Sequence, residues 1–427
     1  MINENEIKFC AQKFGTPLYF YNGDKLKSHV SKIYNSLHSS IEVFFSLKSN
    51  NNISIAALLY QWGCGIEVAS LGELKLALKA GFSSEKIIFS GPGKTLEELI
   101  YAGSKNLFSI IIESFNELQL LVRVAQENQI KINVGIRVNP NKGFSGSSIK
   151  MGGLPRQFGI DEDQIDKVIK AILDEPLLQF KGIHVYSGTQ ILKEDSILSS
   201  FEYTLNLAGK IQNIYNIKLS MVNFGGGFGV KYFDHEQDLD FEYLTREINK
   251  IIISKIDKFS KCKFIIESGR YLLAKSGTYI TKTNFIKESK GEKFIIVDGG
   301  LHHHAAATFR GRMMRNNFPI KVVKNTENLL ECSMEEQVHI VGPLCTPEDC
   351  LAKNIKLPKI DIGDYICILN SGAYGLTYSP INFLGHCTPP EILFYKTEFH
   401  VIRNRGNHRD ILLNQNYVEF KDGDYDK

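Results

Sequence analysis

The chain has 427 residues, of which 43% are hydrophobic and 23% are charged, enough for two to three domains with a sizeable core. With 50 Lys and Arg against 47 Asp and Glu, the formal net charge is only +3, which favours neither nucleic acid nor an anionic membrane as a partner. The 35 Gly and 12 Pro are ordinary numbers and argue against a disordered or fibrous chain.

Short apolar runs alternate with amphipathic helical segments between residues 41 and 268. The runs that read as strands are 41–47, 65–70, 86–91, 107–113, 131–138, 181–187, 219–226 and 263–268. The segments between them place apolar residues three and four apart, as amphipathic helices do. The runs are almost continuously apolar, which is typical of parallel strands buried on both faces. Eight such strands predict a (β/α)₈ TIM barrel; a doubly wound sheet is the rival architecture.

The pattern changes after about residue 280. The runs that read as strands here, with no helical segments between them, are 278–287, 292–300, 335–343, 364–372, 391–397 and 399–404. They predict a C-terminal antiparallel β-domain, to which the first 25 residues add a strand. The expected fold class is therefore α/β, with a barrel over 26–280 and a β-rich domain over 281–427 together with 1–25.

Targeting signals and metal motifs are not evident in the sequence. No apolar run reaches the roughly 18 residues that a membrane span needs. The first residues lack the basic and apolar regions of a secretory signal. The eight cysteines form no CxxC pair, which argues against a disulfide framework or a structural zinc site. We therefore expect a cytoplasmic protein.

Polar side chains and glycines stand where the predicted barrel strands end, at the rim that carries the chemistry of such barrels. The residues at these positions are Lys48, Glu67, Arg137, His184, Ser187, Gly225, Gly226, Gly227, Glu267, Gly269 and Arg270. Their convergence on one rim of an apolar barrel predicts an active site there.

The glycine run and Lys48 each allow two interpretations. Three glycines let backbone N–H groups approach an anion closely, and barrels often bind phosphate after strands seven and eight; the alternative is a tight flexible turn. A lysine desolvated at the barrel mouth loses basicity and can form a Schiff base; the alternative is an ordinary surface charge.

Glu267 and His184 are similarly ambiguous when each is taken alone. Glu267 could hold a proton on a heterocyclic nitrogen, or it could be a satisfied core carboxylate. His184 could stack on a flat ring, or it could be a hydrogen-bonded core histidine. Taken together, a phosphate cradle, an amine, an acid and a flat imidazole predict pyridoxal 5'-phosphate as the cofactor.

With these residues assembled, the chain resembles the fold-type III pyridoxal-phosphate decarboxylases, the alanine-racemase-like group that includes diaminopimelate, ornithine and arginine decarboxylases. The resemblance covers about residues 15–395 and rests on the motifs FFSLKSN, HVYSG, NFGGGFG, ESGR, GPLCTPED and SGAY. It implies that Lys48 forms the Schiff base and that His184 stacks on the cofactor ring. It further implies that Glu267 pairs with the pyridine nitrogen. Residues implied to hold the phosphate are Ser187, Gly225, Gly226, Gly227, Gly269, Arg270 and Tyr374, with Glu67 and Arg137 as further cofactor contacts.

The GPLCTPED motif implies that Cys345 and Asp349 enter the active site of the other subunit of a homodimer. The resemblance then assigns catalysis to Lys48, His184 and Cys345. Alanine racemase lacks this cysteine element, so its presence favours decarboxylation over racemisation. The alternative for Cys345 is a small buried hydrophobe, the usual fate of a free cysteine.

Some residues depart from the group's pattern. Thr346 stands where diaminopimelate and ornithine decarboxylases carry an acid for the distal ammonium of their substrates. Glu67 replaces a customary Asp, and the usual F-N-G reads Phe383-Leu384-Gly385. Specificity for lysine, ornithine or diaminopimelate is therefore in doubt.

Within the group, the segments DGGLHHHAAATFRGR and GPLCTPEDCL resemble butirosin-type decarboxylases that act on a glutamyl-[acyl-carrier protein]. The implied function is removal of the α-carboxylate of a carrier-bound L-glutamyl group; the alternative is a free amino-acid decarboxylase, such as diaminopimelate decarboxylase. Arg310, Thr346 and Asp349 are the expected substrate contacts. Arg310, with two neighbouring arginines, could meet an acidic carrier or a phosphopantetheine phosphate, or it could lie in a solvated loop.

Two other classes remain open at this point. One is a non-catalytic pyridoxal-phosphate carrier protein, which would lack the second domain and the cysteine element. The other is a metal-dependent or phosphate-sugar barrel enzyme with His302, His303 and His304 as ligands. Because neighbouring residues of a β-type segment alternate sides, these three could not all face one ion, and we expect no metal.

Overall fold

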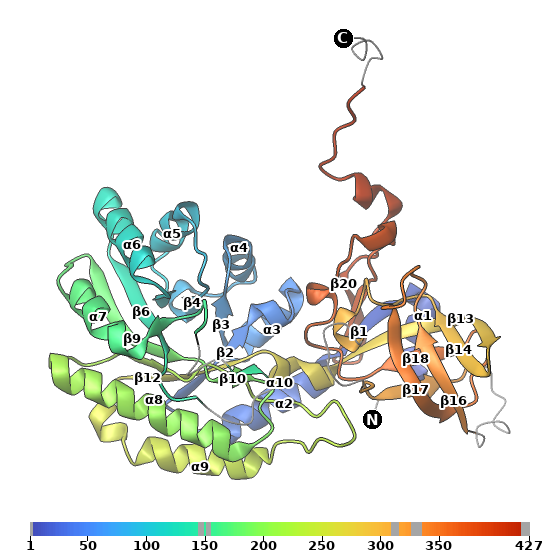
Figure 1. Cartoon of the computed structure of the whole chain (residues 1–427), viewed down its shortest axis with the longest axis horizontal. Helices are drawn as coiled ribbons and strands as arrows, with labels where there is room; N and C mark the ends of the chain where they lie inside the picture. The colour runs from blue at the N-terminus through green and yellow to red at the C-terminus, as the bar shows by residue number, and fades with distance from the viewer. Residues whose placement is uncertain (1–2, 144–148, 151–154, 309–315, 326–334, 420–427) are drawn as a thin grey trace.

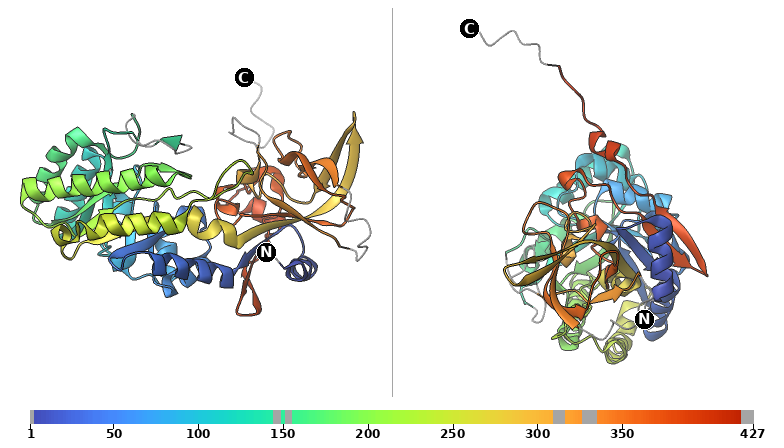
Figure 2. Two further views of the ribbon diagram at one scale, coloured as in Figure 1. Left: turned by 90° about the horizontal axis from the view of Figure 1, so that it is seen from below. Right: turned by 90° about the vertical axis from the view of Figure 1, so that its right-hand side faces the viewer.

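The computed structural model describes residues 3–143, 149–150, 155–308, 316–325 and 335–419. It has two bodies, a barrel surrounded by helices and a β-rich domain beside it (Figure 1). The side view in Figure 2 shows that the long helices of the barrel run toward the β-rich domain. Within the described part of the chain, no helix combines the length and apolar character needed to cross a membrane.

The barrel is built from eight parallel strands: β2 (Ile41–Ser46), β3 (Gly65–Val68), β4 (Ile87–Phe89), β5 (Ser109–Ile112), β6 (Ile132–Asn139), β9 (Leu178–Val185), β11 (Met221–Asn223) and β12 (Lys263–Ser268). They are hydrogen-bonded in the order β5-β4-β3-β2-β12-β11-β9-β6, and β5 pairs with β6 to close the ring. Every predicted strand of the first region forms within a few residues of its expected bounds. The (β/α)₈ barrel prediction is therefore confirmed.

The helices of the barrel are α2 (Gly23–Ser36), α3 (Ile53–Gln61), α4 (Leu71–Lys79), α5 (Leu96–Gly103), α6 (Phe115–Asn128), α7 (Ile165–Leu173), α8 (Glu194–Tyr215), α9 (Phe241–Ile253) and α10 (Arg270–Leu273). Several begin at a hydroxyl cap, because Ser70, Thr95 and Ser114 each accept a hydrogen bond from the backbone three residues on. These caps fix where each strand-to-helix loop ends, and those loops form the rim of the barrel.

The second body is a sheet of β1 (Leu18–Asn22), β13 (Gly277–Ser289), β14 (Glu292–Val297), β15 (Ile320–Val323), β16 (Glu335–Val341), β17 (Cys350–Pro358), β18 (Tyr365–Ile368), β19 (Glu391–Tyr395) and β20 (Glu398–Arg403). Helix α1 (Glu4–Phe14) packs against it at β1 and β15. The sheet is mixed rather than purely antiparallel, because β1 runs parallel to β19 and β14 runs parallel to β16. Strands β15 and β17 were not predicted.

A buried carboxylate joins the two bodies next to the lysine that follows β2. Glu391, on β19, accepts hydrogen bonds from Tyr21 (2.8 Å) and from Asn52 (2.7 Å), and it pairs with Arg403 (2.5 Å). Asn50 donates to the backbone oxygen of Gly372 at 3.1 Å. The segment immediately after Lys48 is therefore anchored to the β-rich domain.

Candidate active site

A pocket lies at the carboxyl ends of the barrel strands, where the β-rich domain meets the barrel. Its lining includes seven predicted residues: Lys48, Gly226, Gly227, Glu267, Gly269, Arg270 and Tyr374. The other lining residues, which the sequence did not single out, are Ser46, Tyr186, Thr189, Phe228, Ser268 and Tyr271. Residues more than 320 positions apart in the sequence thus share one pocket.

Lys48 lies in the 3₁₀ turn Leu47–Ser49, which directly follows β2. Its Nζ is 3.3 Å from Oε2 of Glu67, a buried residue on β3, and its side chain is 46% exposed. Burial by itself would lower the pKa of Lys48, but the negative charges of Glu67 and Glu267 outweigh it and raise the pKa. The expectation of a lysine with lowered basicity is therefore wrong for the chain by itself, because two carboxylates lie close to the amine.

Glu267 and His184 lie side by side on neighbouring parts of the barrel wall. Asn223 donates to Oε1 of Glu267 at 2.7 Å, and Nε2 of His184 is 3.6 Å from Oε2 of the same carboxylate. Burial raises the pKa of Glu267, against the opposing effects of the Lys48 charge and the Asn223 hydrogen bond. Burial, assisted by the charge of Arg137, lowers the pKa of His184 to about 3. His184 is therefore a neutral, flat ring at neutral pH.

The glycine run after β11 is a tightly packed turn. A Cβ added to Gly226 would stand 2.1 Å from the backbone oxygen of Glu267, and one added to Gly227 would stand 2.2 Å from that of Gly188. Gly225 and Gly227 also have φ values of +63° and +97°, which disfavour side chains. The turn is tight, as the alternative interpretation expects, and the backbones of Glu267 and Gly188 leave no room for a side chain at Gly226 or Gly227.

Replacing Gly226 by alanine tests this packing. We expect Gly226→Ala to lower the melting temperature and to weaken cofactor binding at least tenfold, since the added methyl group forces the turn away from β12. Gly209→Ala, in the middle of α8 with no atom nearer than 4.0 Å, is the matched control and should not destabilise the protein. Equal melting temperatures and equal cofactor affinity in the two variants would contradict the prediction.

Arg270 and Tyr374 form the side of the pocket next to the glycine run. The guanidinium of Arg270 stacks over the Tyr374 ring at 4.5 Å, and its Nη1 donates to Tyr232 at 3.4 Å. The backbone N–H of Tyr374 donates to the oxygen of Ser49 at 2.7 Å, so the β-rich domain delivers this ring to the turn that carries Lys48. The positive φ of Tyr374, 55°, is held by that contact.

Arg137, Ser187 and Gly225 lie next to the pocket but do not line it. Arg137 is the register partner of His184 in the β6–β9 pair, and its guanidinium lies 5.6 Å from the centre of the Tyr186 ring. Ser187 is buried directly after β9, and a Cβ on Gly225 would touch Val185 and Tyr186. These residues surround the lining residue Tyr186.

The loop that carries Cys345 belongs to the β-rich domain and does not contribute to the lining of the pocket within this chain. The thiol is exposed, which excludes the interpretation of Cys345 as a small buried hydrophobe. Asp349 is buried and uses both carboxylate oxygens within the chain, accepting from the backbone of Leu301 (2.6 Å) and of Leu344 (2.8 Å). Asp349 is thus a clamp for the cysteine loop, and Thr346, in that loop, is half-buried. Arg310, the remaining predicted substrate contact, lies outside the described residues.

The three consecutive histidines lie in a buried turn after β14, and the expected β-type segment is wrong here. His303 contacts Tyr279 and the backbone oxygen of Cys387, and His304 lies 2.8 Å from the hydroxyl of Ser371. Over the ranges that the structure describes, no group of three or more His, Cys, Asp or Glu residues could hold a metal ion. The turn packs behind the loop that presents Tyr374.

Comparison with known proteins identifies the family. A family model described as "Pyridoxal-dependent decarboxylase, pyridoxal binding domain" matches residues 23–274. The chain belongs to this family. A diaminopimelate decarboxylase of Campylobacter jejuni is 30% identical over 97% of this chain and 100% of its own. The L-glutamyl-[BtrI acyl-carrier protein] decarboxylase of Niallia circulans is 47% identical over 98% of each chain.

Solved structures of this family share the two-body architecture of the chain. A diaminopimelate decarboxylase from Methanocaldococcus jannaschii, in complex with L-lysine, superposes with a TM-score of 0.88 at 27% identity, covering 96% of this chain and 94% of that one. A diaminopimelate decarboxylase from Helicobacter pylori gives a TM-score of 0.85 at 27% identity. The protein is thus a pyridoxal-phosphate-dependent decarboxylase with the fold predicted from its sequence.

The pocket of this decarboxylase fits pyridoxal 5'-phosphate chemically. Neither ring nitrogen of the buried His184 makes a hydrogen bond with a described residue, as suits a ring whose flat face is its contact. The Nε atom of Arg270 likewise has no hydrogen-bond partner within the described chain, beside a glycine turn suited to an anion. Glu267 offers a buried acid for a ring nitrogen, and Lys48 offers an amine.

Proposed function

We propose that this enzyme removes the α-carboxylate of an L-glutamyl group carried on an acyl-carrier protein. The observation that carries the proposal is the 47% identity, over 98% of both chains, to a decarboxylase named for that substrate. The neutral side chain of Thr346 beside Cys345 also supports it, since the resemblance expects an acid there in enzymes that grip a distal ammonium. We place the enzyme in the cytoplasm, because the seven described cysteines are all free, which suits a reducing compartment.

Within this proposal each polar group of the pocket has a distinct role. Bound pyridoxal phosphate supplies an electron sink for bond cleavage at the α-carbon. Lys48 holds the cofactor through its amine, and Glu67 at 3.3 Å orients that amine. Glu267 keeps a proton on the ring nitrogen, and the neutral His184 packs against the ring. The glycine turn, Ser187, Gly269, Arg270 and Tyr374 bind the phosphate.

Decarboxylation leaves the α-carbon in need of a proton. We assign its delivery to the Cys345 thiol of a second subunit, or to a water molecule that the thiol orients. The exposure of Cys345 supports this assignment, since the thiol is available at the surface of its own protomer. The clamp by Asp349 holds the loop that would enter the partner. The enzyme is then a homodimer with two shared sites.

The substrate proposal is tested by giving purified holoenzyme a glutamyl-loaded carrier protein, free L-glutamate and free diaminopimelate. We expect kcat/KM for the tethered substrate to exceed those for the free amino acids by at least 100-fold, because remote contacts with the carrier contribute to transition-state binding. Mass spectrometry detects the loss of CO₂ in each case. Efficient turnover of free diaminopimelate would reject the proposal in favour of a free amino-acid decarboxylase.

Shared sites are tested by mixing two inactive variants. Lys48→Ala and Cys345→Ala homodimers should each lose activity, whereas mixed dimers contain one site with both residues intact. Random reassortment of an equal mixture makes half of the dimers mixed, and each mixed dimer has one intact site of its two. About a quarter of the wild-type activity should therefore return. No recovery after confirmed subunit exchange would contradict shared sites. Mixing Lys48→Ala with itself is the control.

A further inference from the structure

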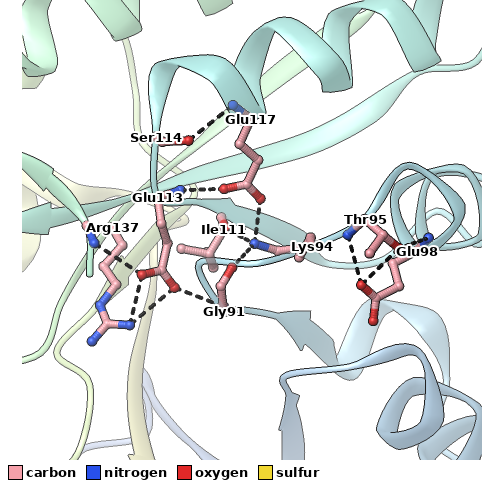
Figure 3. A network of polar contacts seen from close by, with 10 residues as sticks. Gly91, Lys94, Thr95, Glu98, Ile111, Glu113, Ser114, Glu117 and Arg137 are labelled. Atoms are coloured by element: carbon pink, nitrogen blue, oxygen red, sulfur yellow. Dashed lines mark hydrogen bonds and ion pairs between the residues drawn. The ribbon is translucent and has the colours of Figure 1, made fainter. Parts of the chain in front are cut away.

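Four charged side chains, Lys94, Glu117, Glu113 and Arg137, form a chain of polar contacts (Figure 3). They come from the ends of β4, β5 and β6 and the segments that follow them. Lys94, in the loop after β4, is buried and donates to the backbone oxygens of Gly91 (2.6 Å) and Ile111 (2.8 Å). Its third partner is Glu117 at 2.5 Å, on the first turn of α6. The three protons of the ammonium group therefore each have an acceptor.

The second half of this chain is centred on Glu113, at the end of β5. The other oxygen of Glu117 accepts a hydrogen bond from the backbone N–H of Glu113 at 2.8 Å, which holds the backbone of Glu113 in place. The Glu113 side chain, with no exposed surface, accepts from the backbone of Gly91 (2.9 Å) and of Gly159 (3.1 Å). Both of its oxygens also accept from Nη1 of Arg137, at 3.2 and 3.1 Å. One carboxylate thus joins three segments of the barrel rim.

Arg137 is the member of this network that contacts a residue of the pocket lining. Its guanidinium lies 4.8 Å from the centre of the Phe158 ring and 5.6 Å from that of Tyr186, which lines the pocket. Arg137 also pairs in register with His184. Two acids and two bases balance one another in the network, and removing one acid leaves the buried guanidinium without its counter-charge.

We propose that Glu113 is a positioning residue that fixes the Arg137 guanidinium beside the cofactor pocket, and that the buried Lys94–Glu117 pair holds Glu113 in place. None of these three residues lines the pocket. Their role is to aim the charge of Arg137 at Tyr186, His184 and Glu267. The charge of Arg137 is felt in the pocket, where it lowers the pKa of both His184 and Glu267, while the opposite charge of Glu113 raises both.

The test is a double-mutant cycle read out by the affinity of the apoenzyme for pyridoxal 5'-phosphate. Glu113→Gln keeps the shape of the side chain and removes its charge, and it should weaken cofactor binding on the order of tenfold, as loss of an outer-shell partner does at ligand sites. Arg137→Gln should have a similar effect, and the double variant should bind no more weakly than Arg137→Gln alone. The visible absorption spectrum of the bound cofactor should change in each single variant, and Glu113→Gln should add no further change in the Arg137→Gln background.

The controls separate positioning from folding. Glu127→Gln, on the exposed face of the same helix α6 in a surface pair with Arg123, should bind the cofactor normally. Glu113→Asp retains the charge but withdraws the carboxylate by one methylene, so it should remain folded and still bind the cofactor more weakly than wild type. Unchanged affinity in folded Glu113→Asp and Glu113→Gln would overturn the proposal. The proposal would also be overturned if Glu113→Gln weakened cofactor binding as much in the Arg137→Gln background as it does in the wild type.

Discussion

Lys48→Ala is expected to abolish the visible absorbance of the cofactor bound through its amine and to lower kcat by roughly 10³- to 10⁴-fold. Among the described residues that line the pocket, Lys48 is the only lysine. It lies 3.3 Å from Glu67 on a short turn held on both sides, by β2 and by the Asn50 contact with Gly372.

The raised pKa of Lys48 sharpens the design of this experiment. Glu67 and Glu267 stabilise the ammonium form of Lys48. The lysine must lose a proton before it can attach the cofactor, and the two carboxylates make that loss harder. Glu67→Gln should therefore lower the pKa of the lysine and shift the pH dependence of cofactor attachment to lower pH. Lys79→Ala, an exposed lysine on α4, is the control for Lys48→Ala and should keep both absorbance and activity. A retained visible band in Lys48→Ala would contradict the role of Lys48.

The barrel could be predicted from sequence because its strands are apolar runs that end abruptly in polar residues or glycine. Strand β17 was missed because three of its residues, Lys353, Asn354 and Lys356, are polar and face solvent. The prediction of a β-type run at the histidine segment 302–304 is wrong, because this turn is held by contacts with residues distant in the sequence, such as Tyr279 and Ser371. Local patterns identify elements, but contacts with residues distant in the sequence decide such turns.

The candidate site shows the same division. Lys48, Glu267 and the glycine run stand at strand ends, so their position could be predicted, and the structure brings them to one pocket. Glu113 ends the predicted strand 107–113 and could have been selected by the same rule. Arg137 was itself predicted as a site residue, but its pairing with Glu113 could not be, because spacing along the chain does not say which charges meet across a barrel. The backbone partners of Asp349 were equally beyond prediction.

Glu267→Gln is expected to reduce kcat by roughly 10²- to 10³-fold while cofactor remains bound, since a neutral amide cannot stabilise a protonated ring nitrogen. The amide retains the shape of the side chain and an oxygen that accepts from Asn223, so packing around β12 is preserved. The pKa of Glu267 is raised by burial, and the nearby charges of Lys48 and Arg137 oppose that rise. Two cations thus act against the effect of burial on this acid.

The matched control is Glu42→Gln, on neighbouring strand β2, where the carboxylate pairs with Lys86 and Lys263 on the opposite end of the barrel. Glu42→Gln removes the same charge from an adjacent strand and should leave kcat unchanged. CO₂ release and the visible spectrum distinguish the two variants in one experiment. A kcat for Glu267→Gln within threefold of wild type would show that the ring nitrogen does not depend on this carboxylate. The protonated ring nitrogen would then need another negative charge in the pocket. Besides Lys48, the remaining ionic side chain in the lining is Arg270, which is positively charged and cannot supply it.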